Sequence, residues 1–302
     1  MTEFPFNLSP LTFPLPMNLH TLAATILPAP LFQRLSGSSI AKRLARGSLW
    51  SLAGSATSRL LVLVAMILVA RVLGKASFGE FGLIQATLGV AGLMAGLGLG
   101  ATGTRFVAQY AATDPDRAGR IIGLVMQISW GTVLVAAGVL VAGSSWIASR
   151  MLDAPHLESA LVWGALLMAA NVLRGIQSGI IAAVERFDLI AKLNVLEGVV
   201  SLMTMVVLAH YFGVHGALLG LAAASMAVWI VGRVMLGGVL KARGIRVSYR
   251  DCWQDWRILH GYSLPSLLSG LVATPVLWFC MTWVAQRPEG YAELGLYNAA
   301  YQ

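Results

Sequence analysis

Long apolar runs alternate with short polar and basic stretches along most of the chain. An α-helix rises 1.5 Å per residue, so roughly 20 apolar residues cross the hydrocarbon core of a bilayer, which is about 30 Å thick. Strands of a transmembrane barrel would be about 10 residues long and would alternate in polarity. The pattern therefore predicts an all-α integral membrane protein with an eighth run beginning at Leu294. The first seven runs are residues 48–70, 82–104, 121–147, 159–184, 193–212, 217–240 and 262–285.

The composition supports the same class. Of the 302 residues, 57% are hydrophobic and 11% are charged, whereas roughly 25% of residues are charged in soluble proteins. The mean hydropathy is +0.75. A soluble enzyme, a disordered chain and a nucleic-acid binder are excluded, because each needs more charged or polar residues. Neither Cys252 and Cys280 nor His210 and His215 have the spacing of a disulfide framework or a metal site, so no metal and no cofactor are predicted.

The basic residues between the runs predict the orientation of the chain. Cytoplasmic loops of membrane proteins are enriched in Lys and Arg. With the N-terminus inside, fourteen of the 21 basic residues fall on the cytoplasmic side and four on the outer side. All connections are short, which argues against an extracytoplasmic catalytic domain. We expect a cytoplasmic N-terminus and a disordered, proline-rich cytoplasmic tail over residues 1–40.

A shift of 213 residues aligns residues 52–83 with residues 265–296 without a gap. In the clearest part, residues 78–83 (FGEFGL) lie over residues 291–296 (YAELGL), and Ala86 then falls on Ala299. If the seventh and eighth runs repeat the first and second, the repeating unit is six helices, and both copies have the same orientation in the membrane. The alternative is coincidence between Gly- and Leu-rich helices.

The repeat predicts the domain organisation of a transporter. Residues 41–245 would form a first six-helix transmembrane lobe. Residues 246–302 would form a cytoplasmic linker and the first one to two helices of a repeated second lobe. Because that lobe should contain six helices, we expect the sequence to be a truncated two-lobe exporter fold.

Several short segments resemble a known family. Residues 70–74 (ARVLG), 78–83 (FGEFGL), 97–101 (LGLGA) and 104–108 (TRFVA) resemble the N-terminal half of bacterial polysaccharide flippases of the O-antigen and exopolysaccharide type. Residues 114–123 (DPDRAGRIIG) resemble the family's second loop, and residues 185–187 (ERF) with Asn194 resemble its fourth. The resemblance covers about residues 40–302. The superfamily also contains multidrug and toxin exporters and the peptidoglycan precursor flippase.

The resemblance implies two six-helix lobes that face each other across a central cavity. It also implies a transporter, not an enzyme, in the bacterial inner (plasma) membrane. This transporter would turn an undecaprenyl-diphosphate-linked oligosaccharide from the inner to the outer leaflet for lipopolysaccharide or exopolysaccharide assembly, driven by an ion gradient or the membrane potential. The implied partners are the lipid-linked oligosaccharide, membrane lipids and other polysaccharide assembly proteins.

Three other functions stay open. An exporter of drugs or other amphiphiles on the same fold would have a cavity with fewer arginines and more aromatic or acidic residues. A membrane enzyme would need a long outer loop or a histidine and acid pair at the membrane face, and neither is evident. The chain could also be an inactive truncated remnant of a flippase.

Ionisable residues at membrane depth cost about 2.5 to 3.5 kcal/mol each on insertion scales and by default suggest function. Arg59, Arg174, Glu197 and Arg233 lie within the apolar runs. The functional interpretation is a cationic cavity in which the guanidinium groups bind a diphosphate. The structural alternative pairs Arg174 with Glu197 between helices and lets Arg233 reach the cytoplasmic interface along its alkyl stem. Glu197 could instead couple an ion or a proton.

Neutral polar residues extend two of these positions into stripes at helical spacing. The stripes are Asn171, Arg174 and Ser178 with Gln177 beside them, and Asn194, Glu197, Ser201 and Thr204. Polar groups facing lipid are costly, so these faces should look into a hydrated cavity or pair across helices. In the functional interpretation the Ser, Asn and Gln side chains, among them Asn171, Gln177, Asn194 and Ser201, bind the sugars.

Two further patterns predict local structure. The second run contains six glycines, among them Gly92 and Gly96, which favour close helix packing over a flexible gate. Asp114 followed by Pro115 predicts a helix start with Asp114 as the cap.

Overall fold

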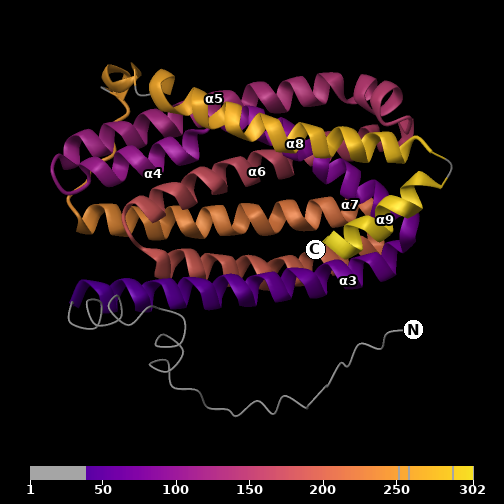
Figure 1. Ribbon diagram of the computed structural model, residues 1–302, viewed down its shortest axis with the longest axis horizontal. Helices are drawn as coiled ribbons and strands as arrows, with labels where there is room; N and C mark the ends of the chain where they lie inside the picture. Colours follow the sequence, from indigo (N-terminus) through magenta and orange to yellow (C-terminus); the bar gives the residue numbers. More distant parts are fainter. Residues whose placement is uncertain (1–38, 251, 258, 288, 302) are drawn as a thin grey trace, which may run out of the picture. The chain divides into compact units, whose positions relative to one another are not determined.

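The computed structural model describes residues 39–250, 252–257, 259–287 and 289–301, and these are helices joined by short turns (Figure 1). The predicted tail lies almost wholly outside the described residues. The helices are α3 (Ser39–Gly96), α4 (Leu99–Tyr110), α5 (Pro115–Trp146), α6 (Glu158–Ala183), α7 (Phe187–Ala242), α8 (Leu264–Ala285) and α9 (Gly290–Tyr301). Short helical turns are η1 (Ile147–Met151), η2 (Pro155–Leu157), η3 (Cys252–Asp255) and η4 (Leu259–Ser263).

Five described helices are long and apolar enough to cross a membrane. Two of these, α3 and α7, are far longer than one crossing requires, and each contains one glycine with positive φ. Gly74 has φ 78° and Gly213 has φ 59°, a conformation that glycine adopts without steric cost. Divided at these glycines, the five helices become the seven predicted spans. The all-α membrane fold is confirmed.

The run predicted as one helix over residues 82–104 is broken, so that boundary was wrong. The helix ends at Gly96, and α4 starts at Leu99 after Leu97 and Gly98, which both have positive φ. The reason is a close contact with the segment before α8. A Cβ on Gly98 would lie 2.6 Å from the carbonyl oxygen of Ser263, so only glycine fits there.

The predicted start of α5 is confirmed. The Asp114 side chain accepts a hydrogen bond of 2.9 Å from the backbone N–H of Arg117, and Pro115 is the first helical residue. The carboxylate therefore satisfies one of the N–H groups that have no partner within the helix.

Within residues 50–302, α6 is the central helix and contacts α4, α5 and α7. Its apolar side chains enter two buried clusters, one containing Leu161 and Met168 and the other containing Ile180 and Ile181. Helix α8 packs along the second half of α3, since Gly270 lies against Leu93. Many apolar side chains on the outer faces are more than half exposed, as expected for helices that face lipid.

The linker after α7 is docked on the first part of α5. The Ser248 N–H donates to the carbonyl of Gly119 (3.3 Å). Asp255 is buried and forms ion pairs with Arg117 (3.1 Å) and Arg120 (3.5 Å). The buried thiol of Cys252 donates to Gln127 (3.0 Å).

Candidate functional site

The predicted repeat brings two helix starts into direct contact. A Cβ on Gly79 would lie 1.9 Å from the carbonyl oxygen of Tyr291, and one on Gly295 would lie 2.2 Å from that of Lys75. The start of α9 therefore crosses α3, just after its break at Gly74, with the backbones almost touching. Under the 213-residue shift this break aligns with the turn between α8 and α9, which agrees with the repeat.

The crossing is tied to the turn after η1. Tyr291 donates a hydrogen bond of 2.8 Å to the carbonyl of Leu152. Burial, together with the negative charges of Glu80 and Asp153, raises the pKa of Tyr291 to about 12. The hydroxyl therefore keeps its proton at neutral pH and remains a donor. The Glu80 carboxylate in turn accepts a hydrogen bond of 2.9 Å from Nε2 of His156.

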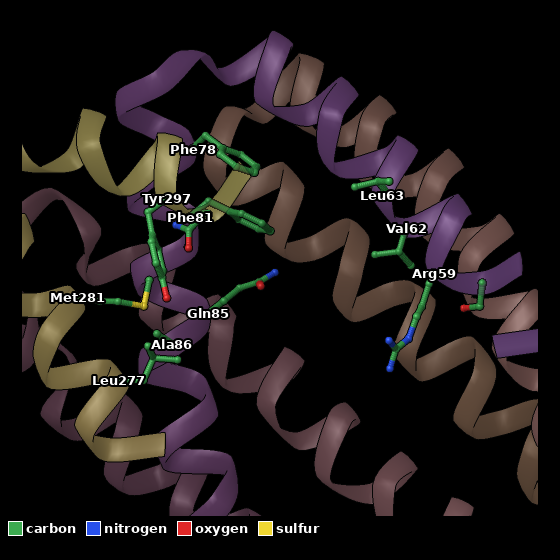
Figure 2. A pocket seen from close by; sticks show the side chains of 13 residues that line it. Arg59, Val62, Leu63, Phe78, Phe81, Gln85, Ala86, Leu277, Met281 and Tyr297 are labelled. Carbon is green, nitrogen blue, oxygen red and sulfur yellow. The ribbon is translucent and has the colours of Figure 1, made fainter. Parts of the chain in front are cut away.

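A cavity of about 510 Å³ lies beside the crossing. Both halves of α3 line it, together with α8 and α9. Figure 2 shows Arg59 and Gln85 on opposite sides of the opening, with Tyr297 and Met281 on the side of Gln85. The lining residues are Ser58, Arg59, Val62, Leu63, Phe78, Phe81, Gly82, Gln85, Ala86, Leu277, Met281, Tyr297 and Asn298.

Arg59 is the charged residue among the described residues of this lining. Its side chain is exposed, and the guanidinium is directed toward the space in front of Gln85 (Figure 2). Phe78, Phe81 and Tyr297 supply aromatic surface, while Gln85 and Asn298 supply amides. The site thus combines one cation, neutral hydrogen-bonding groups and ring faces, a set suited to a ligand that is anionic and polar at once.

The structure contains the interhelical pair that was one alternative for Arg174 and Glu197. Arg174 on α6 donates to the Glu197 carboxylate on α7, and both side chains are partly buried. The Ser201 hydroxyl donates a hydrogen bond of 2.6 Å to the backbone carbonyl of Glu197. This geometry satisfies the two charges within the bundle and leaves the Arg174 Nε without a hydrogen-bond partner among the described residues.

The other predicted site residues are spread over the bundle. Asn171 accepts from Ser225 (2.9 Å) and lines a second cavity of about 360 Å³, which Gln85 also borders. Gln177 is 2% exposed and packs against Gly232. Asn194 is half-buried.

Arg233 lies elsewhere, beside the linker. It donates to the Tyr249 hydroxyl (3.0 Å) and contacts the sulfur of Met126 (3.6 Å). Of the residues predicted to form the site, Arg59 therefore lines the larger cavity and Asn171 the smaller one. Gln85, Asn298 and Tyr297 were missed. The repeat offered a signal for the two amides, because each directly precedes an alanine of the aligned pair Ala86 and Ala299.

A family model described as polysaccharide biosynthesis protein matches residues 44–302. The chain belongs to this family. The chain is also similar to the lipid III flippases of Escherichia coli (strain K12) and Shigella flexneri, each 27% identical over 273 residues. The match covers 84% of the chain and 61% of each relative, so the chain spans less than two thirds of their length.

Two solved structures have the same fold as the chain. One is an outward-facing multidrug resistance MATE family transporter of the MOP superfamily, with a TM-score of 0.66 and 19% identity over 85% of the chain and 58% of that structure. Another is a MOP superfamily transporter from Pyrococcus furiosus, with a TM-score of 0.65 and 18% identity over 85% and 61%. The chain is thus a multi-pass helical membrane protein with the MOP superfamily fold.

Proposed function

We propose that the chain carries the substrate cavity of a flippase. This flippase moves an undecaprenyl-diphosphate-linked oligosaccharide from the inner to the outer leaflet of the bacterial inner membrane, without covalent chemistry. The N-terminus lies in the cytoplasm, and the energy comes from an ion gradient or the membrane potential. Family membership and the flippase relatives support the substrate class, and the excess of basic residues in the inner loops supports the orientation.

The observation that carries the proposal is the position of Arg59. A guanidinium exposed in a cavity among membrane-spanning helices is costly unless an anion or water meets it. Its planar fork of donors fits two phosphate oxygens at once. Arg59 therefore contacts the diphosphate. Arg174 is paired with Glu197 and does not line this cavity, so Arg59 is the cation among the described residues of its lining.

An exporter of other amphiphiles on the same fold is the second candidate. The aromatic residues Phe78, Phe81 and Tyr297 in the lining favour it. A cation exporter would need a carboxylate, and the described lining residues include none.

The test is genetic and chemical. The gene is deleted in the source bacterium, and lipid-linked saccharides and surface polysaccharide are measured with and without the chain supplied back. We expect the surface polymer to disappear and the lipid-linked unit to accumulate, with both reversed when the chain is supplied back. Arg59→Gln at normal protein levels should fail to reverse them. No accumulation of lipid-linked saccharide after deletion would refute the flippase and favour the exporter.

A further inference from the structure

Two carboxamides occupy equivalent positions in the two copies of the predicted repeat. Under the 213-residue shift, Gln85 falls on Asn298. Gln85 lies on α3 beyond the break at Gly74, and Asn298 lies on α9, the helix that aligns with it. Both side chains line the larger cavity. The repeat thus places one amide from each lobe at a single site.

Both amides have an unused hydrogen-bonding group. The Nε2 atom of Gln85 and the Nδ2 atom of Asn298 are shielded, with no hydrogen-bond partner among the described residues. Shielded amide nitrogens normally have hydrogen-bond partners, because leaving one unsatisfied costs more free energy than a typical hydrogen bond contributes. Both side chains are partly exposed and line the same cavity, so a ligand there is within reach of both carboxamides.

The surroundings hold the two amides in place. The Asn298 amide lies directly over Gly82, where a Cβ would approach to 1.7 Å. Gln85 is one helical turn further along α3, borders both the larger and the smaller cavity and faces the space into which Arg59 projects (Figure 2). The cavity thus has a cationic side at Arg59 and a neutral polar side at the amide pair.

The chemistry of the two sides differs. An amide offers both donors and an acceptor and carries no charge, so it matches hydroxyl and acetamido groups but does not neutralise phosphate. The aromatic rings of Phe81 and Tyr297 beside it provide apolar faces for the C–H surface of a sugar ring. The neighbourhood of Gln85 and Asn298 therefore suits a saccharide, whereas that of Arg59 suits its diphosphate.

We propose that Gln85 and Asn298 form a two-lobe amide pair that binds the saccharide portion of the substrate. This inference rests on the proposed flippase function and assigns the sugar-binding part of the same cavity. One lobe alone would provide half of the pair, so sugar binding requires α3 and α9 to be in contact as they are at the Gly79 and Gly295 crossing.

The experiment measures binding to the purified chain in lipid nanodiscs by isothermal titration calorimetry. The two probes are the methyl ester of undecaprenyl diphosphate and undecaprenyl-diphosphate-linked N-acetylglucosamine, which carry the same charge on the diphosphate and differ in the sugar. The variants are Gln85→Leu, Asn298→Leu and Arg59→Gln. Gln109→Leu is the matched control, because Gln109 is an exposed amide on α4 outside the cavity lining.

We expect the unmodified chain to bind the sugar-bearing probe more tightly than the sugar-free one. Each amide variant should weaken the sugar-bearing probe by roughly 3- to 10-fold, the value of one neutral hydrogen bond, and leave the sugar-free probe unchanged. Arg59→Gln should weaken both probes equally. Thermal unfolding of each variant tests for misfolding, since replacing a half-buried amide whose nitrogen has no partner with leucine should leave Tm unchanged or raise it.

Each other outcome is decisive. If the unmodified chain binds both probes equally, or if the amide variants weaken both probes or neither, the amide pair does not bind sugar, while the Arg59 assignment is decided by whether Arg59→Gln weakens both probes. The same conclusion holds if Gln109→Leu has the effect of the amide variants. If the unmodified chain binds neither probe, the proposed function fails and this inference fails with it.

Discussion

From the close crossing of α3 and α9 we predict how far Gly79→Ala destabilises the contact between these two helices. A new Cβ would lie 1.9 Å from the Tyr291 carbonyl oxygen, whereas ordinary contact begins near 3.4 Å. The obstacle is backbone, so no side-chain rotation relieves it, and the helices must separate by roughly 1.5 Å. Overpacking of this kind costs about 1 to 3 kcal/mol.

Hydrogen exchange of the α9 amides measures this cost directly. Local opening that is easier by about 1 to 3 kcal/mol speeds exchange roughly 5- to 100-fold. The matched control is Gly89→Ala on the same half of α3, where a Cβ meets nothing within 4 Å, and it should leave α9 unaffected. Unchanged exchange in Gly79→Ala, or equal acceleration in both variants, would refute the backbone contact between these helices.

Three further predictions follow from other contacts. Glu197→Gln should lower Tm because it leaves Arg174 partly buried without a counter-charge. The double variant Arg174→Met with Glu197→Leu should recover most of the lost Tm, because it removes both charges. A double variant no more stable than Glu197→Gln would contradict this prediction. The raised pKa of Tyr291 makes its full contribution to stability below about pH 10, the usual tyrosine pKa, and this contribution is lost as the pH rises toward about 12. The Tm difference between the unmodified chain and Tyr291→Phe should therefore shrink over that range. A constant Tm difference would contradict this prediction. Asp255→Asn should release the linker and speed maleimide labelling of buried Cys252; unchanged labelling would show that the ion pairs do not hold the linker.

The spans were predictable because they depend on local composition. A run of apolar residues long enough to cross a bilayer can be recognised from hydropathy alone. Gly74 and Gly213, where α3 and α7 break, fall between predicted runs. The break at Leu97 and Gly98 was not predictable from hydropathy, since both residues continue an apolar run. It arises from the approach of Ser263, which is distant in sequence.

The site shows the same division. Arg59 could be found because a charge at membrane depth is costly wherever it points. The same argument selected Arg233, but which face of a helix meets the cavity depends on its neighbours, and the structure places Arg233 beside Tyr249. Gln85 and Asn298 have no charge and no stripe of polar neighbours, so only the repeat links them before the structure is known.

The docked linker changes where the first lobe can be cut. Residues 246–250 and 252–255 lie against the start of α5, and Cβ atoms on Gly119 and Gly123 would lie about 2 Å from the carbonyl oxygens of Arg246 and Ser248. A fragment ending at residue 245 would expose this glycine surface and leave Arg117 and Arg120 without Asp255. The smallest stretch expected to fold as the first lobe therefore ends after Asp255, and a protease that cuts between α7 and α8 should cleave beyond that residue.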